Sequence, residues 1–173
     1  MIVRPEEPAD RPASLDVERE AFGSNEEATI VEAIRDEPGS FALVAEDAGE
    51  VVGHVQLSAA RIGDVQVLAL GPIGVRPDRQ RQGIGSALIR EALAEAGTRG
   101  SPAVILLGDP DLYPRYGFEP ASRFGLRNPF TGVQPDGFVV HEEDFMLALL
   151  DERAAARQLN GEVRWHHAFG QPG

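Results

Sequence analysis

Apolar residues recur at helical spacing near the start of the chain and at strand spacing directly after it. Residues 14–22 and 25–35 carry them three or four positions apart, which predicts two amphipathic helices. Residues 41–45 and 51–57 are two strand-like runs joined by a short polar turn. This first part of the chain therefore predicts two helices followed by a β-hairpin.

The middle of the chain predicts a strand, a helix and a second strand. Residues 65–75 are strand-like, residues 85–96 place their apolar side chains on one broad helical face, and residues 103–107 are wholly apolar, as in a strand buried on both faces. Such a unit joins two parallel strands by a right-handed crossover. The dipeptide Gly71-Pro72 falls inside the first strand, where a regular central strand has neither residue, and we expect a bulge there.

The last third of the chain has weaker periodicity. Residues 108–118 predict a short helix, with Asp111 as its N-cap so that Pro114 falls in the first turn. Residues 119–137 are rich in proline and glycine and predict a loop. Two strands, a helix and a last strand are expected after it, at residues 138–140 and 145–150, 151–158 and 161–169.

Composition excludes several classes of chemistry. The 173 residues, 42% of them hydrophobic, suffice for a single domain over residues 1–173 without a metal or disulfide as support. The absence of cysteine excludes disulfides, thiolate metal ligands and acyl transfer through a cysteine. A formal net charge of -12 disfavours nucleic-acid and anionic membrane partners. It either serves solubility alone or favours cationic partners such as amines.

The sequence carries no recognisable targeting or membrane segment. The N-terminal residues lack the basic and then apolar pattern of a signal peptide, and no run of about 18 apolar residues occurs. We therefore expect a cytoplasmic protein.

A glycine-bearing turn rich in hydrogen-bond donors separates the strand at 65–75 from the helix at 85–96. The backbone N–H groups of such a turn, with the positive end of the helix behind it, can hold a pyrophosphate. Two nucleotide-binding motifs are nevertheless excluded. All 16 cationic residues are arginine, so the lysine of a Walker loop is missing. Leu88 stands where the dinucleotide fingerprint needs its third glycine.

The hexapeptide Gln80-Arg81-Gln82-Gly83-Ile84-Gly85 instead resembles the central motif of the GNAT superfamily of acyl-CoA-dependent N-acetyltransferases. That motif is Gln/Arg-x-x-Gly-x-Gly/Ala between the fourth strand and the next helix, and Gln80, Gly83 and Gly85 match it. The resemblance implies a mixed α/β fold with a central, mostly antiparallel sheet of six or seven strands and helices on both faces. In this fold one parallel pair of strands splays around the cofactor.

The resemblance also implies which residues bind the donor, acetyl-CoA. Backbone amides of the turn hold the CoA pyrophosphate in this family, which here are those of Arg81, Gln82, Gly83, Ile84, Gly85 and Ser86. Backbone groups of the splayed strand hold the pantetheine arm and the thioester, which here are those of Ile73, Gly74 and Val75. A free N–H near Val75 would stabilise the oxyanion that forms when the amine attacks.

Residues 113–118 are similar to the family's Tyr-x-x-x-Gly-Phe signature after the fifth strand. By this resemblance Tyr113 is the general acid that protonates the departing CoA thiolate. A phenol of pKa about 10 faces a thiol of pKa about 8.5 in such a transfer. Tyr116 would serve instead if the helix register differs, and otherwise it packs.

The general base is left open by the sequence. Many family members carry a glutamate on the fourth strand, where this chain has only Gln66. A water chain, a carboxylate such as Asp109, or no dedicated base are the alternatives. His54, within a predicted strand, either lines the acceptor cleft or is a structural histidine. Because the sequence has no HExxH motif or carboxylate cluster, we expect no metal site.

The sequence is identified as a stand-alone, bacterial-type member of this superfamily. We expect it to transfer an acetyl group from acetyl-CoA to a primary amine of a small molecule or peptide. The amine would attack directly in a ternary complex and enter opposite the donor. Two other functions stay open, namely a non-catalytic acyl-CoA-binding or regulatory module and an enzyme that takes a different nucleotide-like donor. A homodimer also stays open.

Overall fold

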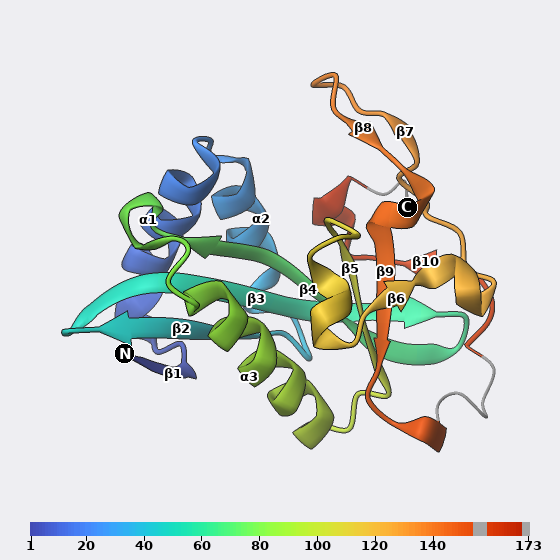
Figure 1. Cartoon of the computed structure of the whole chain (residues 1–173), viewed down its shortest axis with the longest axis horizontal. Coiled ribbons are helices and arrows are strands. Elements are labelled where there is room, and N and C mark those ends of the chain that lie inside the picture. Colours follow the sequence, from blue (N-terminus) through green and yellow to red (C-terminus); the bar gives the residue numbers. More distant parts are fainter. Residues whose placement is uncertain (154–158, 171–173) are drawn as a thin grey trace. The chain divides into compact units, whose positions relative to one another are not determined.

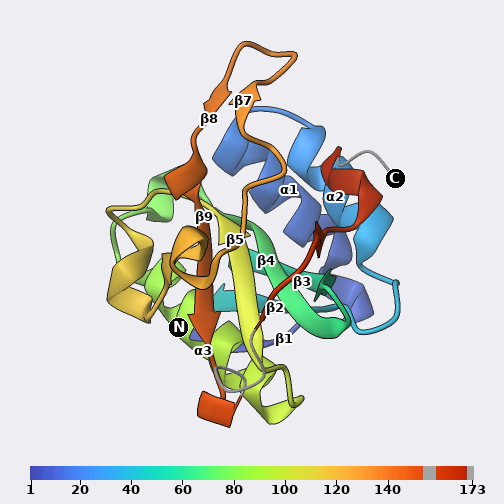
Figure 2. The same cartoon turned by 90° about the vertical axis from the view of Figure 1, so that its right-hand side faces the viewer.

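The computed structural model of the chain describes residues 1–153 and 159–170 (Figure 1 and Figure 2). The α-helices of these residues are α1 (Arg11–Phe22), α2 (Glu26–Ile34) and α3 (Ile84–Thr98). The strands are β1 (Ile2–Pro5), β2 (Phe41–Asp47), β3 (Glu50–Ile62), β4 (Val65–Val75), β5 (Ala103–Leu107), β6 (Glu119–Pro120), β7 (Gly132–Val133), β8 (Val139–Val140), β9 (Phe145–Leu149) and β10 (Val163–Arg164).

Eight of these strands form one mixed sheet in the order β1-β2-β3-β4-β5-β9-β6, with β10 beside β3. Antiparallel ladders join β1 to β2, β2 to β3, and β9 to both β5 and β6. A parallel ladder joins β4 to β5, at Leu68 with Val104 and at Ala69 with Ile105. The predicted α/β fold with a mostly antiparallel sheet and one parallel pair is thereby confirmed. The sheet is wider than the six or seven strands expected because the two-residue strands β6 and β10 add to it.

Two compact units make up the chain. Unit 1 holds residues 1–58 and 70–95, and unit 2 holds residues 59–69 and 96–173. In unit 1, helices cover both faces of the hairpin β2–β3 (Figure 1).

The two faces of β3 are identified by neighbouring residues, because successive side chains of a strand point to opposite faces. A Cβ on Gly53 would lie 2.9 Å from side-chain atoms of α3. The ring of His54, the next residue, contacts Glu18 on α1. Helix α3 therefore packs on one face of the hairpin and α1 on the other.

Gly53 lets α3 lie unusually close to the sheet. A Cβ at this position would stand 2.9 Å from both Ile84 Cγ2 and Leu88 Cδ1, which is inside the van der Waals contact distance of two carbon atoms. Ile84 is the first residue of α3 and is 3% exposed. This contact thus holds the N-terminal end of α3, which is the end of a helix that can bind an anion.

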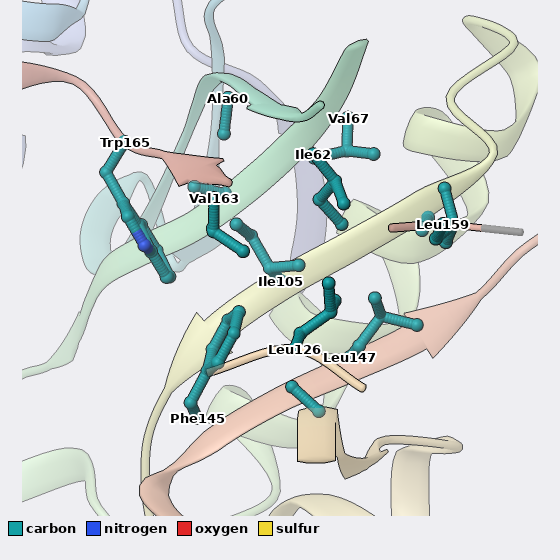
Figure 3. Packing of buried hydrophobic residues seen from close by; sticks show 13 residues of the cluster. Ala60, Ile62, Val67, Ile105, Leu126, Phe145, Leu147, Leu159, Val163 and Trp165 are labelled. Atoms are coloured by element: carbon teal, nitrogen blue, oxygen red, sulfur yellow. The ribbon is translucent and has the colours of Figure 1, made fainter. Parts of the chain in front are cut away.

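The core of unit 2 surrounds β5 (Figure 3). Strand β5 pairs with β9 along its whole length, and Figure 2 shows the two strands side by side. Trp165 closes this core, with its ring 5.7 to 5.9 Å from the rings of Phe130, Phe145 and Phe169. Tilted and edge-on aromatic contacts of this kind add to the stabilisation from burial itself.

The segment 108–118 forms a 3-10 turn, Tyr113–Tyr116, with Pro114 in its first turn as predicted. The predicted cap, Asp111, is wrong. Asp109 instead accepts a hydrogen bond at 2.8 Å from the N–H of Asp111, and its carbonyl accepts those of Leu112 and Tyr113. The side chain of Asp109 therefore forms a local turn with the backbone two residues later. Such side-chain turns are an alternative to helix capping for aspartate.

Elsewhere the predicted elements agree with the structure except in short segments. Strand β4 has the predicted bounds, its Gly71–Pro72 peptide is cis, and the bulge expected there stays a prediction. The sequence pattern does not predict β1, because Arg4 and Pro5 interrupt its apolar run. The predicted loop at 119–137 holds β6 and β7, and the predicted strand at 161–169 shrinks to β10. The helix expected at 151–158 falls mostly outside the described residues.

We expect Gly53→Ala to destabilise the protein by about 1–3 kcal/mol, because the added methyl group must displace Ile84 and Leu88 in a packed interface. Urea unfolding followed by circular dichroism measures the change. The matched control is Gly97→Ala near the end of α3, where a Cβ meets no atom within 4 Å and alanine favours the helix. Equal stabilities of the two variants would contradict the close approach of α3.

Candidate active site

The turn between β4 and α3 has the geometry of an anion-binding site. Arg81 and Gly83 adopt left-handed backbone conformations, with φ of 60° and 85°. Helix α3 begins directly afterwards at Ile84, and the N–H of Ala87 donates to the carbonyl of Gly83 at 3.0 Å. The N–H groups of Ile84 and Gly85 belong to the first turn of the helix, where no carbonyl lies one turn back within the helix. Donors and the positive end of the helix are thus brought together, as in sites that bind phosphate.

Two side chains hold this turn in place. Gln80 Nε2 donates to the carbonyl of Val75 at 3.1 Å and so closes the loop on the end of β4. Arg79 forms an ion pair with Asp47 at the end of β2, and the N-terminal amino group lies 3.1 Å from the same carboxylate. The hydrogen bond from Arg79, with that from the N-terminus, lowers the pKa of Asp47. The Asp47 carboxylate therefore stays ionised throughout the neutral pH range.

Gly85 leaves room in front of the donors of α3. A Cβ there would meet only Val75 Cγ2, at the ordinary contact distance of 3.9 Å, and its backbone conformation suits any residue. Gly83 differs, because its φ of 85° is one that side chains rarely adopt. Glycine at position 85 is thus required neither by packing nor by the backbone. The space at the position of a Gly85 Cβ is open apart from this one contact.

The backbone of β4 beside this turn presents groups to both of its edges. The N–H of Arg76 donates to the carbonyl of Val52 on β3 at 3.0 Å. Because the backbone groups of successive residues point to opposite edges of a strand, those of Gly74 also point toward β3. Those of Ile73 and Val75 point away from β3. Since the carbonyl of Val75 accepts from Gln80, its N–H is the group through which Val75 could contact a donor.

Tyr113 lies in unit 2 and is buried. Its ring packs edge-on against Phe118, with ring centroids 5.7 Å apart, and it covers Gly108, where any Cβ would overlap it. Burial raises the pKa of the Tyr113 phenol above its ordinary value of 10, and the charges of Tyr116 and Asp109 raise it further. The phenol therefore keeps its proton at neutral pH, as a general acid must. Tyr116 is half-buried, with its ring 6.4 Å away.

Three residues bear on the general base and the acceptor cleft: Gln66 at the place of the missing glutamate, the candidate base Asp109, and His54. They lie in very different surroundings. Gln66 on β4 and Asp109 are both exposed, and the carboxylate of Asp109 is engaged in its local turn. His54 is fully buried, and its Nδ1 lies 2.6 Å from Glu18 Oε1. Its Nε2 has no hydrogen-bond partner among the residues that the structure describes. Only one of the two ring nitrogens of His54 is therefore hydrogen-bonded within the described residues.

Glu18 is the residue of this region that sequence reasoning missed. It lies on the buried face of α1, four residues after Ser14 and one after Val17. A glutamate within such a face is a signal that the sequence does contain, but its partner His54 is 36 residues away. Burial raises the pKa of the Glu18 carboxyl, while the hydrogen bond and charge of His54 act to lower it.

Neither a group of metal ligands nor a membrane-spanning helix is present among the described residues. Within residues 1–153 and 159–170, no group of three or more histidine, aspartate or glutamate side chains is placed to hold a metal ion. No helix in the same ranges is long and apolar enough to cross a membrane.

Comparison with known proteins identifies the family. A model described as the acetyltransferase (GNAT) family matches residues 8–118. The chain belongs to the GNAT family. Membership confirms the predicted superfamily and the predicted class of enzyme, an acetyl-CoA-dependent acyltransferase.

Relatives of known sequence and structure agree with GNAT membership. YhbS of Escherichia coli (strain K12), described as an uncharacterized N-acetyltransferase, is 33% identical over 175 residues, which is 99% of either chain. The crystal structure of Escherichia coli YhbS in complex with CoA has a TM-score of 0.83 and 31% identity, over 99% of this chain and 93% of that one. A GNAT acetyltransferase of Brucella melitensis in complex with acetyl-CoA has a TM-score of 0.74 and 29% identity, over 97% of both chains.

We expect Gly85→Glu to weaken acetyl-CoA binding at least about tenfold, because it sets a negative charge in front of donors that hold a pyrophosphate in GNAT enzymes. The fold should persist, since the position is open and acidic side chains stabilise the first turn of a helix. Isothermal titration calorimetry measures the affinity. Gly85→Ala is the matched control, and it should bind like the wild type because the GNAT motif accepts alanine there. Equal affinities of the two variants would place the pyrophosphate elsewhere.

Proposed function

We propose that this GNAT enzyme transfers an acetyl group from acetyl-CoA to a primary amine that attacks the thioester directly. The observation that carries the proposal is the turn before α3, where the left-handed residues Arg81 and Gly83 precede the helix N-terminus and Gly85 leaves open space. A site without lysine binds pyrophosphate through backbone N–H groups and the helix dipole. The relatives crystallised with CoA and acetyl-CoA support the same donor.

In this proposal the donor lies along the end of β4 and the turn. The pyrophosphate is held by backbone N–H groups of Arg81, Gln82, Gly83, Ile84, Gly85 and Ser86. The pantetheine arm and the thioester contact backbone groups of Ile73 and Val75, which point away from β3. The N–H of Val75 polarises the thioester carbonyl and stabilises the oxyanion. The contribution of Gly74 is its missing side chain, because Glu18 Oε2 lies 2.8 Å from the place of its Cβ.

We further propose that both units act as one domain over residues 1–173, since the family match at 8–118 includes residues of each. Tyr113 in unit 2 is the acid that protonates the departing thiolate. The acceptor is an amine of a small molecule or peptide that is cationic in solution. A net charge of -12 favours the approach of such a cation over that of nucleic acids or anionic lipids.

CoA release with a panel of amines tests this function. We expect at least one of spermidine, kanamycin, glycine and a lysine-containing peptide to accelerate thiol release from acetyl-CoA. Since the chain has no cysteine, a thiol reagent reports only the CoA that is formed. Tight acetyl-CoA binding by calorimetry without release for any amine would instead favour a non-catalytic binding module. Binding of ADP without competition from CoA would favour another donor.

We expect Tyr113→Phe to lower kcat by about 10²- to 10⁴-fold, which is the usual contribution of a general acid. The affinity for acetyl-CoA should stay close to the wild-type value, because only the hydroxyl group is removed. Stopped assays of CoA release give kcat, and calorimetry gives the affinity. Since burial raises the pKa of Tyr113, loss of activity through its deprotonation should occur at a higher pH than for an exposed tyrosine.

Tyr116→Phe is the matched control for this prediction, because Tyr116 lies in the same 3-10 turn and its ring is 6.4 Å from that of Tyr113. It should retain the wild-type kcat. Full activity in Tyr113→Phe would remove Tyr113 from the mechanism, and a loss confined to Tyr116→Phe would transfer the role to Tyr116.

A further inference from the structure

Four ionisable side chains meet in the interior of unit 1. Glu18 on α1 and His54 on β3 are both 0% exposed, with Glu18 Oε1 2.6 Å from His54 Nδ1. Beyond the ring, His54 Nε2 lies 3.8 Å from Glu6 Oε1, and that oxygen lies 3.7 Å from the Arg35 guanidinium. Glu27 on α2 adds a negative charge that also acts on Glu18.

This cluster is incompletely satisfied. Glu18 Oε2, His54 Nε2 and Glu6 Oε1 have no hydrogen-bond partner in the part of the chain that the structure describes. A buried polar atom without a partner opposes folding, and a buried ion pair often stabilises a fold less than apolar side chains of the same volume. Stability alone therefore does not account for the cluster, or for the unpartnered oxygen Oε2 of Glu18.

The surroundings of Glu18 Oε2 indicate what this oxygen could act on. Glu18 Oε2 lies 2.8 Å from the place where a Cβ on Gly74 would stand, so it approaches β4 directly over the backbone of Gly74. The neighbours Ile73 and Val75 are the residues proposed to hold the thioester. Helix α1, which carries Glu18, covers the face of the hairpin opposite α3. Glu18 Oε2 therefore lies beside the backbone of Gly74 on the α1 side of β4, where the protein covers it in this structure.

We propose that Glu18 is the general base that takes a proton from the ammonium group of the acceptor, and that His54 positions its carboxylate. This inference rests on the proposed function, because it takes the thioester to lie beside Ile73 and Val75.

Atoms and charges balance in the following way. The acceptor arrives as an ammonium ion, since only about one aliphatic amine in a thousand is neutral at pH 7. Glu18 accepts one proton at Oε2 and becomes a carboxylic acid. The freed lone pair forms the bond from nitrogen to the thioester carbon, the carbon–sulfur bond breaks, and its electron pair leaves on sulfur. Tyr113 protonates the sulfur and is reprotonated from the nitrogen, and Glu18 later releases its proton to solvent. One amide, one thiol and one proton result.

The surroundings of Glu18 suit this role. Burial raises the pKa of its carboxyl, and the negative charge of Glu27 raises it further, while His54 lowers it. A base works best when its pKa lies close to the working pH, where it is both ionised and able to hold a proton. The bond from His54 to Oε1 leaves Oε2 as the oxygen that is turned toward β4.

The pH dependence of kcat/KM tests the assignment, with the panel amine that releases CoA fastest as the acceptor. With a base in the site, kcat/KM for total amine is level between the pKa of the base and that of the amine. Without one it rises tenfold per pH unit up to the pKa of the amine, because only neutral amine reacts. We expect a level profile for the wild type. Glu18→Gln should show the tenfold rise per unit and lie about 10²- to 10³-fold below the wild type at pH 7.

Two further variants separate the base from a structural group. Glu20→Gln removes an exposed carboxylate two residues along the same helix and should keep the wild-type profile. His54→Gln should move the acidic limb of the profile to higher pH, because it removes the contact that lowers the pKa of Glu18. A histidine with only a packing role would change stability without moving this limb.

The outcomes that overturn the inference are distinct from those that overturn the proposed function. A wild-type profile that rises tenfold per pH unit overturns it whatever the variants show, and so does a level profile in Glu18→Gln. If Glu18→Gln does not fold by circular dichroism, an unmoved acidic limb in folded His54→Gln overturns it. Failure of every amine to release CoA rejects the proposed function and this inference together. Release with the wrong pH profile rejects the role of Glu18 alone.

Discussion

The dipeptide Gly53-His54 on β3 determines which helix packs on each face of the hairpin in unit 1. Gly53 admits α3 so closely that a Cβ would stand 2.9 Å from its side chains. His54 points to the opposite face and contacts Glu18 on α1 at 2.6 Å. One strand thus carries α3 on one face and a buried carboxylate on the other. In the proposed function, this alternation separates the donor side of the reaction from the acceptor side.

In the proposed function, the turn before α3 binds the pyrophosphate without a lysine. A backbone N–H is a weaker attractor than an ammonium group, so several must be held together before the ligand arrives. Gln80 does this by bonding the carbonyl of Val75, and the pair Arg79–Asp47 anchors the turn to β2. The glutamine of the motif thus acts here on the shape of the turn. Its side-chain amide already donates to the carbonyl of Val75.

Local patterns predict the parts of the structure that local contacts determine. The strand β4, the turn and the helix α3 follow from periodicity and two glycines within residues 65–98, and these agree with the structure. The predicted cap Asp111 is wrong because Leu112 takes the N-cap position without a side-chain cap, while the Asp109 side chain bonds the N–H of Asp111. Strands of two residues, such as β6 and β10, have no period to detect and depend on their sheet neighbours.

The pair Glu18–His54 is a different case, because each half is visible in the sequence and the pairing is not. A glutamate on the apolar face of a helix and a histidine in a buried strand each have many local explanations. Only the packing of α1 on β3 joins them across 36 residues. The same packing brings Glu18 to Gly74, where no side chain stands in its way. The sequence therefore shows the residues of such a site one by one, but it does not predict the long-range contacts that join them.

The burial of Glu18 has opposite effects on stability and on chemistry. Its raised pKa means that the folded state binds this proton more tightly than the unfolded chain does. The free energy of unfolding therefore falls as pH rises from the ordinary carboxyl pKa through the raised one, and the ionised carboxylate is held at the expense of stability. An apolar side chain at the same position would avoid that loss. The same raised pKa that lowers the free energy of unfolding also means that the carboxylate binds a proton more tightly. Tight proton binding is the property that a general base requires.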